Sequence, residues 1–426
     1  MFKFKATRVG ADTTLSQIIK MVEEAQASTA NIQRIADKVA SYFVPAVISV
    51  AFFSAAGWSF YGNYTSALLS FVAVLIIACP CALGIATPAA LMVGVGKGAE
   101  LGILIRGAEY LERAEKLNAV VFDKTGTLTK GEPEVTGIIT FDLREEDLLL
   151  YAATAEKGSE HPLAEAILRK AEMAGLSIPD AEAFEAIPGH GVRVKINGKE
   201  VLIGNRRLMK DKGVRIEEKE KVISGLEEKG NTVMLVAEDG QLRGMIAVAD
   251  TLKENAEEVV KGLKSEGVQV IMLTGDNEKT ARAIGAQVGI DRIIANVLPG
   301  DKAKIIKELQ SEGKVVAMVG DGINDSPALA QSDIGIAIGS GSDVAKETGG
   351  IILVKDDLRD VIMSIKLSKA TMRKIKQNLF WAFFYNTAAI PLAAFGLLNP
   401  IIAAAAMSIS SLSVVTNSAL LKRVKI

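Results

Sequence analysis

Two long blocks of this chain contain no charged side chain, and no other feature of the sequence restricts its fold as strongly. Residues 39–96 and 377–421 include no Asp, Glu, Lys, Arg or His. Because a membrane-spanning helix needs about 20 predominantly apolar residues, each block is long enough for two spans and a short turn. Residues 61–64 and 396–400 contain the Gly and Asn residues that suit such turns. The sequence therefore predicts four transmembrane helices in two hairpins.

Basic residues flank both blocks and predict their orientation. Lys and Arg collect on the cytoplasmic side of a membrane, so both hairpins should begin and end in the cytoplasm of a multi-pass protein of the cell membrane. The flanking cations are Lys38, Lys97, Arg106, Arg373, Lys374, Lys376, Lys422, Arg423 and Lys425. The net charge of the whole chain is only -1, so charge does not favour nucleic acid as a partner, and none is expected.

The charged middle of the chain has the pattern of an α/β protein. Helix-like segments alternate with short Val- and Ile-rich runs that end at or near an Asp or Gly, namely NAVVFD, GVQVIMLTGD, KVVAMVGDG, DIGIAIG and GIILV. This alternation predicts a parallel doubly wound sheet, whose active site lies at the carboxyl ends of its strands. Between residues 137 and 245 the pattern changes to helices and hairpins, with the turn dipeptides Asn197-Gly198 and Asp239-Gly240. We expect a smaller α+β domain inserted into the first.

The chain is therefore predicted to have several domains around a membrane region. A short polar strand and turn begins it, and an amphipathic helix over 15–38 leads into the first span. The expected segments are 1–14, 15–97 with the first hairpin, 98–136 and 246–370 as the two parts of the α/β domain, 137–245 as the insertion, and 371–426 with the second hairpin.

Asp123 directly follows an apolar strand, within the stretch VVFDKTGTLT. A carboxylate in this position can act as a nucleophile toward phosphorus and form an aspartyl phosphate. Gly126 allows a tight turn, and the amides and hydroxyls of the loop can surround phosphate oxygens. The structural alternative for a single Asp here is a cap on the following helix.

Three further motifs at strand ends favour phosphate chemistry over capping: TGDN at 274–277, PGDK at 299–302 and GDGIND at 320–325. Thr274 and Lys302 would neutralise the charge of a transferred phosphate. Asp321 would hold Mg²⁺ together with the nucleophilic Asp, and Asn324 and Asp325 would support them. These are the parts that a phosphoryl-transfer site needs.

DKTGTLT, TGD and GDGIND, in this order, resemble the P-type ion-pumping ATPases, whose catalytic domain is similar to the haloacid dehalogenase hydrolases. The resemblance covers nearly the whole chain, and the four predicted spans lie around the motifs in the family's order. It implies that Asp123 takes the γ-phosphate of ATP. It also implies catalytic roles for Lys124, Thr125, Gly275 and Asp276, with Thr125 and Asp123 at the Mg²⁺ site.

Two further motifs, SEHP at 159–162 and PGHGV at 188–192, resemble the nucleotide-binding domain of the heavy-metal branch of this family. By that likeness His161 packs on or near the adenine of ATP. The other implied pocket residues are Glu156, Gly189, Gly191 and Gly204. The structural alternatives are a helix start, because Pro is favoured in the first turn, and a Gly-x-Gly pair without function. His161 and His190 are the only histidines of the chain.

The only two cysteines, Cys79 and Cys81, flank Pro80 inside a predicted span. Proline breaks a helix, and broken helices at mid-membrane commonly form the ion sites of transporters. Soft thiolates select Cu(I) and similar ions, although cysteine also serves as a small apolar filler. We do not expect a structural disulfide between cysteines one residue apart. In a phosphorylating pump whose membrane blocks hold no carboxylate, the two thiols are predicted metal ligands.

The second hairpin narrows the choice of transported ion. The monovalent-copper subgroup has a Tyr-Asn pair in one helix and a Met with a Ser pair in the next, and this chain similarly has Tyr385, Asn386, Met407 and Ser411, with Ser410 beside it. The zinc and cadmium subgroup has a Lys and an Asp in those helices instead, and both are absent here. The resemblance therefore implies transport of Cu⁺, with Ag⁺ as a second ion, out of the cytoplasm. Helix packing is the structural alternative for the Met and Ser residues.

The family's actuator domain carries a Thr-Gly-Glu loop, which this sequence lacks. Residues 6–26 resemble the last strand and exit helix of that domain, so the chain is similar to the C-terminal part of a copper pump, without leading helices or N-terminal metal-binding modules. We expect it to bind ATP and phosphorylate Asp123, but to hydrolyse the intermediate slowly. The expected partners are membrane lipid, ATP, a heavy-metal ion and a copper chaperone. A Zn²⁺/Cd²⁺ pump, or a membrane-anchored phosphatase or metal-binding fragment that does not transport, remain the alternatives.

Overall fold

The computed structural model of the protein describes residues 14–28, 30–159, 161–187, 189–276, 278–321, 325–339 and 349–424. The chain forms two compact units. Unit 1 comprises Met1–Asn118, Leu309–Ala317 and Leu329–Ile426, and unit 2 comprises Ala119–Glu308 and Met318–Ala328. The strand and turn expected at the N-terminus, and Asn324 of the predicted phosphate site, lie outside the described residues.

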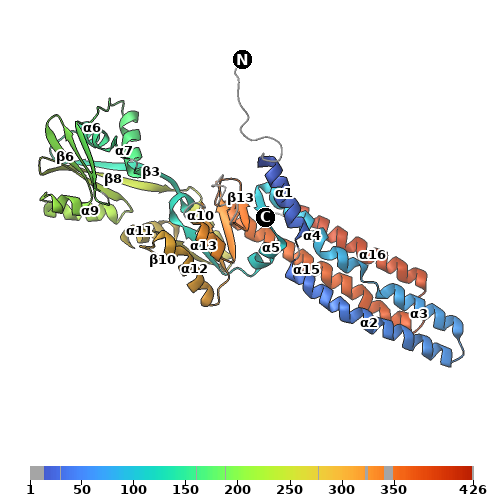
Figure 1. Ribbon diagram of the computed structural model, residues 1–426. Coiled ribbons are helices and arrows are strands. Elements are labelled where there is room, and N and C mark those ends of the chain that lie inside the picture. Colours follow the sequence, from blue (N-terminus) through green and yellow to red (C-terminus); the bar gives the residue numbers. More distant parts are fainter. Residues whose placement is uncertain are drawn as a thin grey trace, which may run out of the picture. The chain divides into compact units, whose positions relative to one another are not determined.

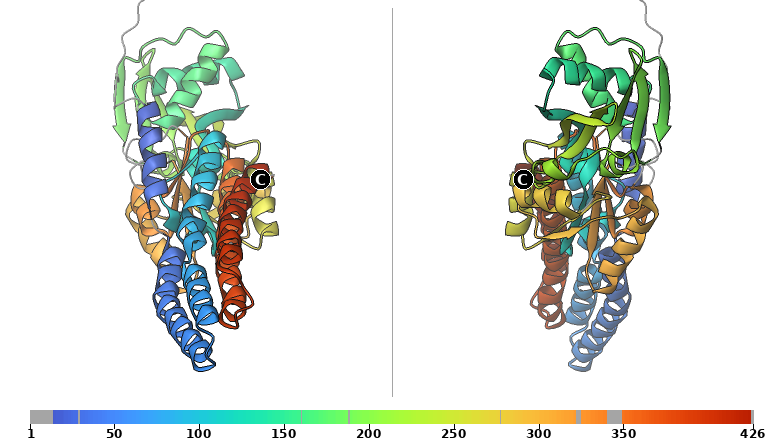
Figure 2. Two further views of the ribbon diagram at one scale, coloured as in Figure 1. Left: turned by 90° about the vertical axis from the view of Figure 1, so that its right-hand side faces the viewer. Right: turned by 90° about the vertical axis from the view of Figure 1, so that its left-hand side faces the viewer.

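Long apolar helices of unit 1 lie side by side as a bundle, as Figures 1 and 2 show. They are α2 (Asn31–Phe60), α3 (Tyr64–Ala78), α4 (Cys81–Leu101), α15 (Arg359–Ala394) and α16 (Pro400–Ala419). Both expected turns are confirmed, because α2 ends and α3 begins around residues 61–63, and α15 and α16 are separated by residues 395–399.

Three helical stretches of the described residues are long and apolar enough to cross a membrane: Ile19–Phe60, Tyr64–Leu101 and Pro400–Arg423. The helix α15 is not among them, since its apolar half contains polar side chains such as Asn378 and Asn386. The membrane character of the chain is confirmed, whereas the count of four spans stays a prediction.

The amphipathic helix expected over residues 15–38 is not continuous, so this prediction is wrong. The helix α1 spans Thr14–Ala27, and α2 begins anew at Asn31. The Ser28 hydroxyl donates to the carbonyl of Ala25 at 2.7 Å. Serine side chains compete in this way for helical carbonyls and so favour helix ends.

The α/β part has the strand order β1-β13-β12-β11-β2-β9-β10. The five apolar runs predicted β2, β9, β11, β12 and β13, whereas the short strands β1 and β10 were missed. The bounds of the strands are β1 (Ile103–Ile105), β2 (Ala119–Asp123), β9 (Gln269–Leu273), β10 (Arg292–Ile294), β11 (Val316–Gly320), β12 (Ile334–Ile338) and β13 (Ile351–Leu353). In unit 2, β2 and β10 both pair parallel with β9, and in unit 1 β12 pairs parallel with β13. The helices of this part are α5 (Ala108–Glu115), α10 (Ala256–Ser265), α11 (Glu278–Val288), α12 (Lys302–Ser311) and α13 (Ser326–Gln331).

The edge strand β1 corrects the expectation of a wholly parallel sheet, because it pairs antiparallel with β13. The chain runs out of α4 into β1 and returns from β13 toward α15. The strand that leaves the helix bundle and the strand that returns to it therefore run in opposite directions.

Unit 2 also contains a six-stranded antiparallel sheet in the order β3-β8-β7-β6-β5-β4. Its strands are β3 (Thr129–Thr140), β4 (Ala183–Ile187), β5 (Gly191–Ile196), β6 (Lys199–Gly204), β7 (Thr232–Glu238) and β8 (Gln241–Leu252). The expected insertion boundaries, 137 and 245, fall inside β3 and β8. Both predicted hairpin turns form, with positive φ at Asn197 and Asp239, as tight two-residue turns require.

Helices cover both faces of this sheet, because apolar residues occupy both sides of the central strands. Val201 and Ile203 of β6 pack with α6 (Glu145–Glu156) and α7 (Pro162–Met173). Leu202 between them packs with α8 (Arg206–Asp211) and α9 (Glu220–Glu227) on the other face (Figure 1). Successive side chains of a strand point to opposite faces, so the α+β insertion has one core on each side.

Candidate functional site

Asp123 is the last residue of β2, a strand whose five residues are all buried, and its own side chain is buried as well. The chain turns immediately afterwards at Gly126, which has a φ of 72°. A Cβ atom at Gly126 would lie 3.0 Å from a carboxylate oxygen of Asp321. Glycine therefore serves both the left-handed turn and the close approach of this second carboxylate to the loop.

Lys302 bridges two carboxylates at the centre of the site. Its Nζ atom lies 2.6 Å from Oδ1 of Asp123 and 2.6 Å from Oδ1 of Asp325. All three side chains are buried. The lysine comes from the start of α12 and Asp325 from the segment after β11, so the fold brings together motifs nearly 200 positions apart in sequence.

The electrostatics of this cluster fit a divalent cation. Burial and the nearby Asp325 raise the pKa of Asp123 to about 6, although Lys302 opposes this shift. Burial also raises the pKa of Asp325. Together with Asp321, these two residues make three carboxylates, whose negative charge exceeds the single positive charge of Lys302. Carboxylate oxygens are the ligands that Mg²⁺ prefers. A bound divalent ion would favour the ionised forms.

The motif TGD lies beside the Asp123 loop, as parallel pairing of β2 with β9 requires. Lys124 forms an ion pair with Asp276 at 2.8 Å, and the main-chain N–H of Asp276 donates to the Thr274 hydroxyl at 3.1 Å. Thr274 is buried, whereas Thr125 and Gly275 are exposed at the surface of the site.

The prediction from sequence missed two residues that hold the loop in place. Asp250 accepts hydrogen bonds from the Thr129 hydroxyl and from the Gly131 N–H, and Lys253 donates to the carbonyl of Gly126 at 3.3 Å. Burial raises the pKa of Asp250. The only signal for them was the polar run after the apolar part of β8, which also suits an ordinary strand end.

Replacing Lys302 by Met should reduce phosphorylation of the chain by about 100-fold or more, as loss of a preorganised charge does in other sites. Because the ammonium lowers the pKa of Asp123, its removal should shift that pKa upward. The nucleophile must be ionised, so the residual rate should fall off at higher pH than in the wild type. Rates of phosphoprotein formation between pH 5 and 9 measure this, and an unchanged profile would contradict the assignment. Lys304→Met, on the same helix, is the control.

A cavity of about 350 Å³ in unit 2 is lined by all five residues expected at the nucleotide. These are Glu156, His161, Gly189, Gly191 and Gly204. Glu156 is buried, and burial raises its pKa. His161 also has the structural role considered as the alternative, since its Nδ1 accepts from the N–H of Leu163 and caps α7.

Two of these glycines are required by the sheet itself. Gly191 and Gly204 are opposite each other in the β5–β6 ladder. A Cβ atom at Gly191 would lie 2.0 Å from the Ile203 carbonyl oxygen, and one at Gly204 would lie 2.1 Å from that of His190. Only hydrogen at these positions lets the two strands approach, and this approach forms one wall of the cavity.

Gly204→Ala is expected to weaken ATP binding about tenfold, because the methyl group would clash with the carbonyl oxygen of His190, a residue that lines the cavity. Isothermal titration with ATP or a non-hydrolysable analogue measures the change. Gly225→Ala is the matched control, since its Cβ would meet nothing within 4 Å and alanine favours a helix. Equal affinities of the two variants would contradict a nucleotide role for this wall.

In the membrane bundle, α3 ends at Ala78 and α4 begins at Cys81, so Cys79 and Pro80 form the expected helix break. The thiols form a disulfide, with Cα atoms 5.4 Å apart. The expectation that they would not pair is therefore wrong. The break gives the two residues a spacing inside the range that disulfides need. Metal binding requires the reduced pair, because the thiolate is the ligand.

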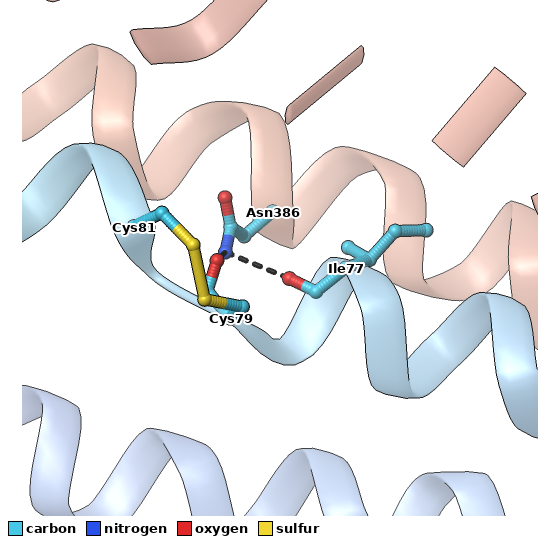
Figure 3. Close-up of a disulfide and its surroundings, with 4 residues drawn as sticks. All are labelled: Ile77, Cys79, Cys81 and Asn386. Carbon is cyan, nitrogen blue, oxygen red and sulfur yellow. Dashed lines mark hydrogen bonds between the residues drawn. A yellow bond between two sulfur atoms is a disulfide. The ribbon is translucent and has the colours of Figure 1, made fainter. Parts of the chain in front are cut away.

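Asn386 is hydrogen-bonded to the main chain at this break. Its amide nitrogen donates to the carbonyl oxygens of Ile77 at 2.8 Å and Cys79 at 3.3 Å (Figure 3). Met407 packs against the apolar cluster that contains Ile77 and Ala78. In the described part of the helix bundle, no third Cys, His, Asp or Glu side chain joins Cys79 and Cys81.

The remaining candidates differ in their surroundings. Tyr385 lies in a row of aromatic rings on α15, 5.9 Å from the ring of Trp381. Ser411 is half-buried, whereas Ser410 is fully buried and its hydroxyl has no hydrogen-bond partner in the part of the chain that the structure describes. The hydroxyl of Ser410 is therefore a better candidate for a buried metal ligand than that of Ser411.

Comparison with known proteins finds relatives over nearly the whole chain. The family model of haloacid dehalogenase-like hydrolases matches residues 117–333. A copper-exporting P-type ATPase of Staphylococcus saprophyticus is 53% identical over 425 residues, which are 99% of this chain and 53% of that protein. A probable copper-exporting P-type ATPase of Archaeoglobus fulgidus is 52% identical over 433 residues, again 99% and 53%. The chain thus spans about half the length of the curated relatives it matches.

Among solved structures, a zinc-transporting PIB-type ATPase in its E2.Pi state matches with a TM-score of 0.82 and 36% sequence identity. The match covers 97% of this chain and 68% of that one.

Proposed function

This chain belongs to the P-type ATPases, and from this premise we propose that it couples phosphorylation of Asp123 by ATP to the movement of Cu⁺ or Ag⁺ out of the cytoplasm. The observation that carries the proposal is the pair of thiols in a broken membrane helix, in a chain that also has the buried Asp123–Lys302–Asp325 cluster. The copper-exporting relatives support the choice of ion.

Phosphorylation would begin with attack of an Asp123 carboxylate oxygen on the γ-phosphorus of ATP. An acyl phosphate forms, the bond to the β-phosphate oxygen breaks, and ADP leaves. Lys302 and the Thr274 hydroxyl would neutralise the transferred phosphate. Asp123 and Asp321 would bind Mg²⁺, with Asp325 and Thr125 completing the site; the ion supplies charge neutralisation when bound.

The cavity of unit 2 would hold the nucleotide. We assign residues 137–245 to nucleotide binding, and residues 98–136 and 246–370 to phosphorylation. Both parts lie in the cytoplasm in this proposal, and the helix bundle lies in the lipid of the cell membrane. A copper chaperone is the proposed donor of the ion.

A zinc pump is the second candidate, because one of the matching solved structures is a zinc-transporting ATPase. The composition of the bundle favours copper: residues 39–96 and 377–421 contain no charged side chain, whereas a divalent ion needs more compensating charge than a monovalent one. Two thiolates already outweigh one positive charge.

Acid-stable phosphoprotein formation from γ-labelled ATP tests the proposal, on the full chain in lipid vesicles with a thiol reductant. Cu⁺ and Ag⁺ should stimulate labelling and Zn²⁺ should not. Stimulation by Zn²⁺ alone would establish the zinc pump, and labelling that no metal changes would favour a phosphatase or a metal-binding fragment.

A further inference from the structure

The helix break at Pro80 releases main-chain carbonyl groups inside the bundle. Proline has no N–H to donate, and α4 starts its own hydrogen bonds with the N–H of Leu83, which donates to the Pro80 carbonyl at 2.8 Å. The carbonyls of Ile77 and Cys79 are instead satisfied from another helix, by the side chain of Asn386. In a membrane, freed backbone groups of this kind must find partners within the protein.

The orientation of the Asn386 amide follows from these partners. Both groups that face it are carbonyl oxygens, which only accept hydrogen bonds, so the NH₂ end must point toward the break. The amide oxygen then lies on the other side, as Figure 3 shows. The oxygen is the atom through which an amide side chain binds a metal. Asn386 is buried, so the two bonds that it makes to the break are not shared with bulk water.

We propose that Asn386 is a positioning residue and not a ligand of the transported ion: it holds the carbonyls of Ile77 and Cys79 and thereby sets the spacing of the two thiols. The ion part of this inference rests on the proposed function. The ion itself is bound by sulfur, from Cys79, Cys81 and Met407, which packs against the cluster beside the break.

Asn386→Asp separates the two roles, because aspartate has the same shape and keeps an oxygen ligand but lacks both N–H donors. If the oxygen binds the ion, the carboxylate should bind Cu⁺ at least as well. If the N–H groups hold the break, Cu⁺ affinity should fall about tenfold or more, as expected when buried acceptors lose their donor. Cu⁺ binding in competition with a chromophoric chelator gives the affinity, and X-ray absorption at the copper edge gives the ligand type.

A second readout needs no metal. Diamide oxidises the two thiols to the disulfide, taking up their two protons and two electrons, and the rate depends on how the break places Cys79 against Cys81. Thiol titration over time should show disulfide formation at least fivefold slower in Asn386→Asp than in the wild type. Asn386→Ala should slow disulfide formation to a similar extent. This second variant shows that the slowing does not come from the carboxylate introduced in Asn386→Asp.

The matched control is Asn378→Asp, on the same helix. Asn378 is also buried, and its amide nitrogen donates to the Ala86 carbonyl at 3.0 Å and the Ser418 hydroxyl at 2.8 Å. This variant should lose a similar amount of thermal stability yet keep wild-type thiol oxidation and sulfur coordination.

Sulfur-only coordination in the wild type, with losses confined to the Asn386 variants, supports the proposal. Undiminished Cu⁺ affinity in Asn386→Asp, or an oxygen ligand in the wild type that disappears in Asn386→Ala, would overturn it, and so would equal losses in Asn378→Asp. A wild-type chain that binds no Cu⁺ but whose thiol oxidation still depends on Asn386 would overturn the proposed function and leave the positioning role intact.

Discussion

Asp123→Asn should reduce acid-stable phosphoprotein to background, a loss of at least about 1,000-fold, because the amide cannot attack phosphorus as a carboxylate does. Labelling with γ-labelled ATP, followed by acid gel electrophoresis, measures the loss. Binding of ATP in the cavity of unit 2 should be unchanged, since none of the residues that line it belongs to the Asp123 cluster. Asp291→Asn is the control, because that side chain is 87% exposed and undergoes the same chemical change.

The same variant should be more stable than the wild type at neutral pH when Mg²⁺ is absent. The pKa of Asp123 rises from 3.8 to about 6 on folding, so the folded state loses stability as pH increases through this interval. A shift of two units corresponds to at most about 3 kcal/mol, which Asn would recover above pH 6. Thermal unfolding at pH 4 and pH 7.5 tests the sign of this effect. The variant should be clearly more stable than the wild type at pH 7.5 and only slightly more stable at pH 4. Greater stabilisation at pH 4 would show that the carboxylate is not destabilised by burial.

Cys79→Ser and Cys81→Ser, singly and together, should abolish the stimulation of phosphorylation by Cu⁺ and weaken Cu⁺ binding by about 100-fold or more. A hydroxyl is a hard ligand with little affinity for Cu⁺, whereas a thiolate is soft. Binding of ATP should not change, because the nucleotide cavity belongs to unit 2 and the thiols to unit 1.

The control for these variants is Ser408→Ala, at an exposed position of α16 whose hydroxyl donates to the Ala404 carbonyl of the same helix. Retention of Cu⁺-stimulated labelling in the double cysteine variant would exclude the thiols as ligands of the transported ion. Loss of labelling in Ser408→Ala would instead indicate that the bundle tolerates no substitution.

The sequence alone determined the parts of this protein that depend on composition and on local pattern. The apolar blocks predicted the helix bundle, the position of Pro80 predicted the break, and the runs ending at Asp123 and Asp321 predicted the strands of the α/β sheet. These features are local, because helix length, proline geometry and strand alternation are readable within a few residues. The antiparallel pairing of β1 was missed, since strand direction depends on where the chain goes next.

Only the tertiary structure decided which chemistry each side chain can perform. Lys302 joins Asp123 and Asp325 across the fold, and no local pattern reveals that one ammonium group serves two carboxylates. Asp250 and Lys253 hold the phosphate loop from a strand that the motifs do not include. Asn386 was predicted as an ion ligand from its position in a motif. In the structure its amide nitrogen donates to the main-chain carbonyls of Ile77 and Cys79 at the helix break. Residue types set which bonds are available, and packing of distant segments selects which of them form.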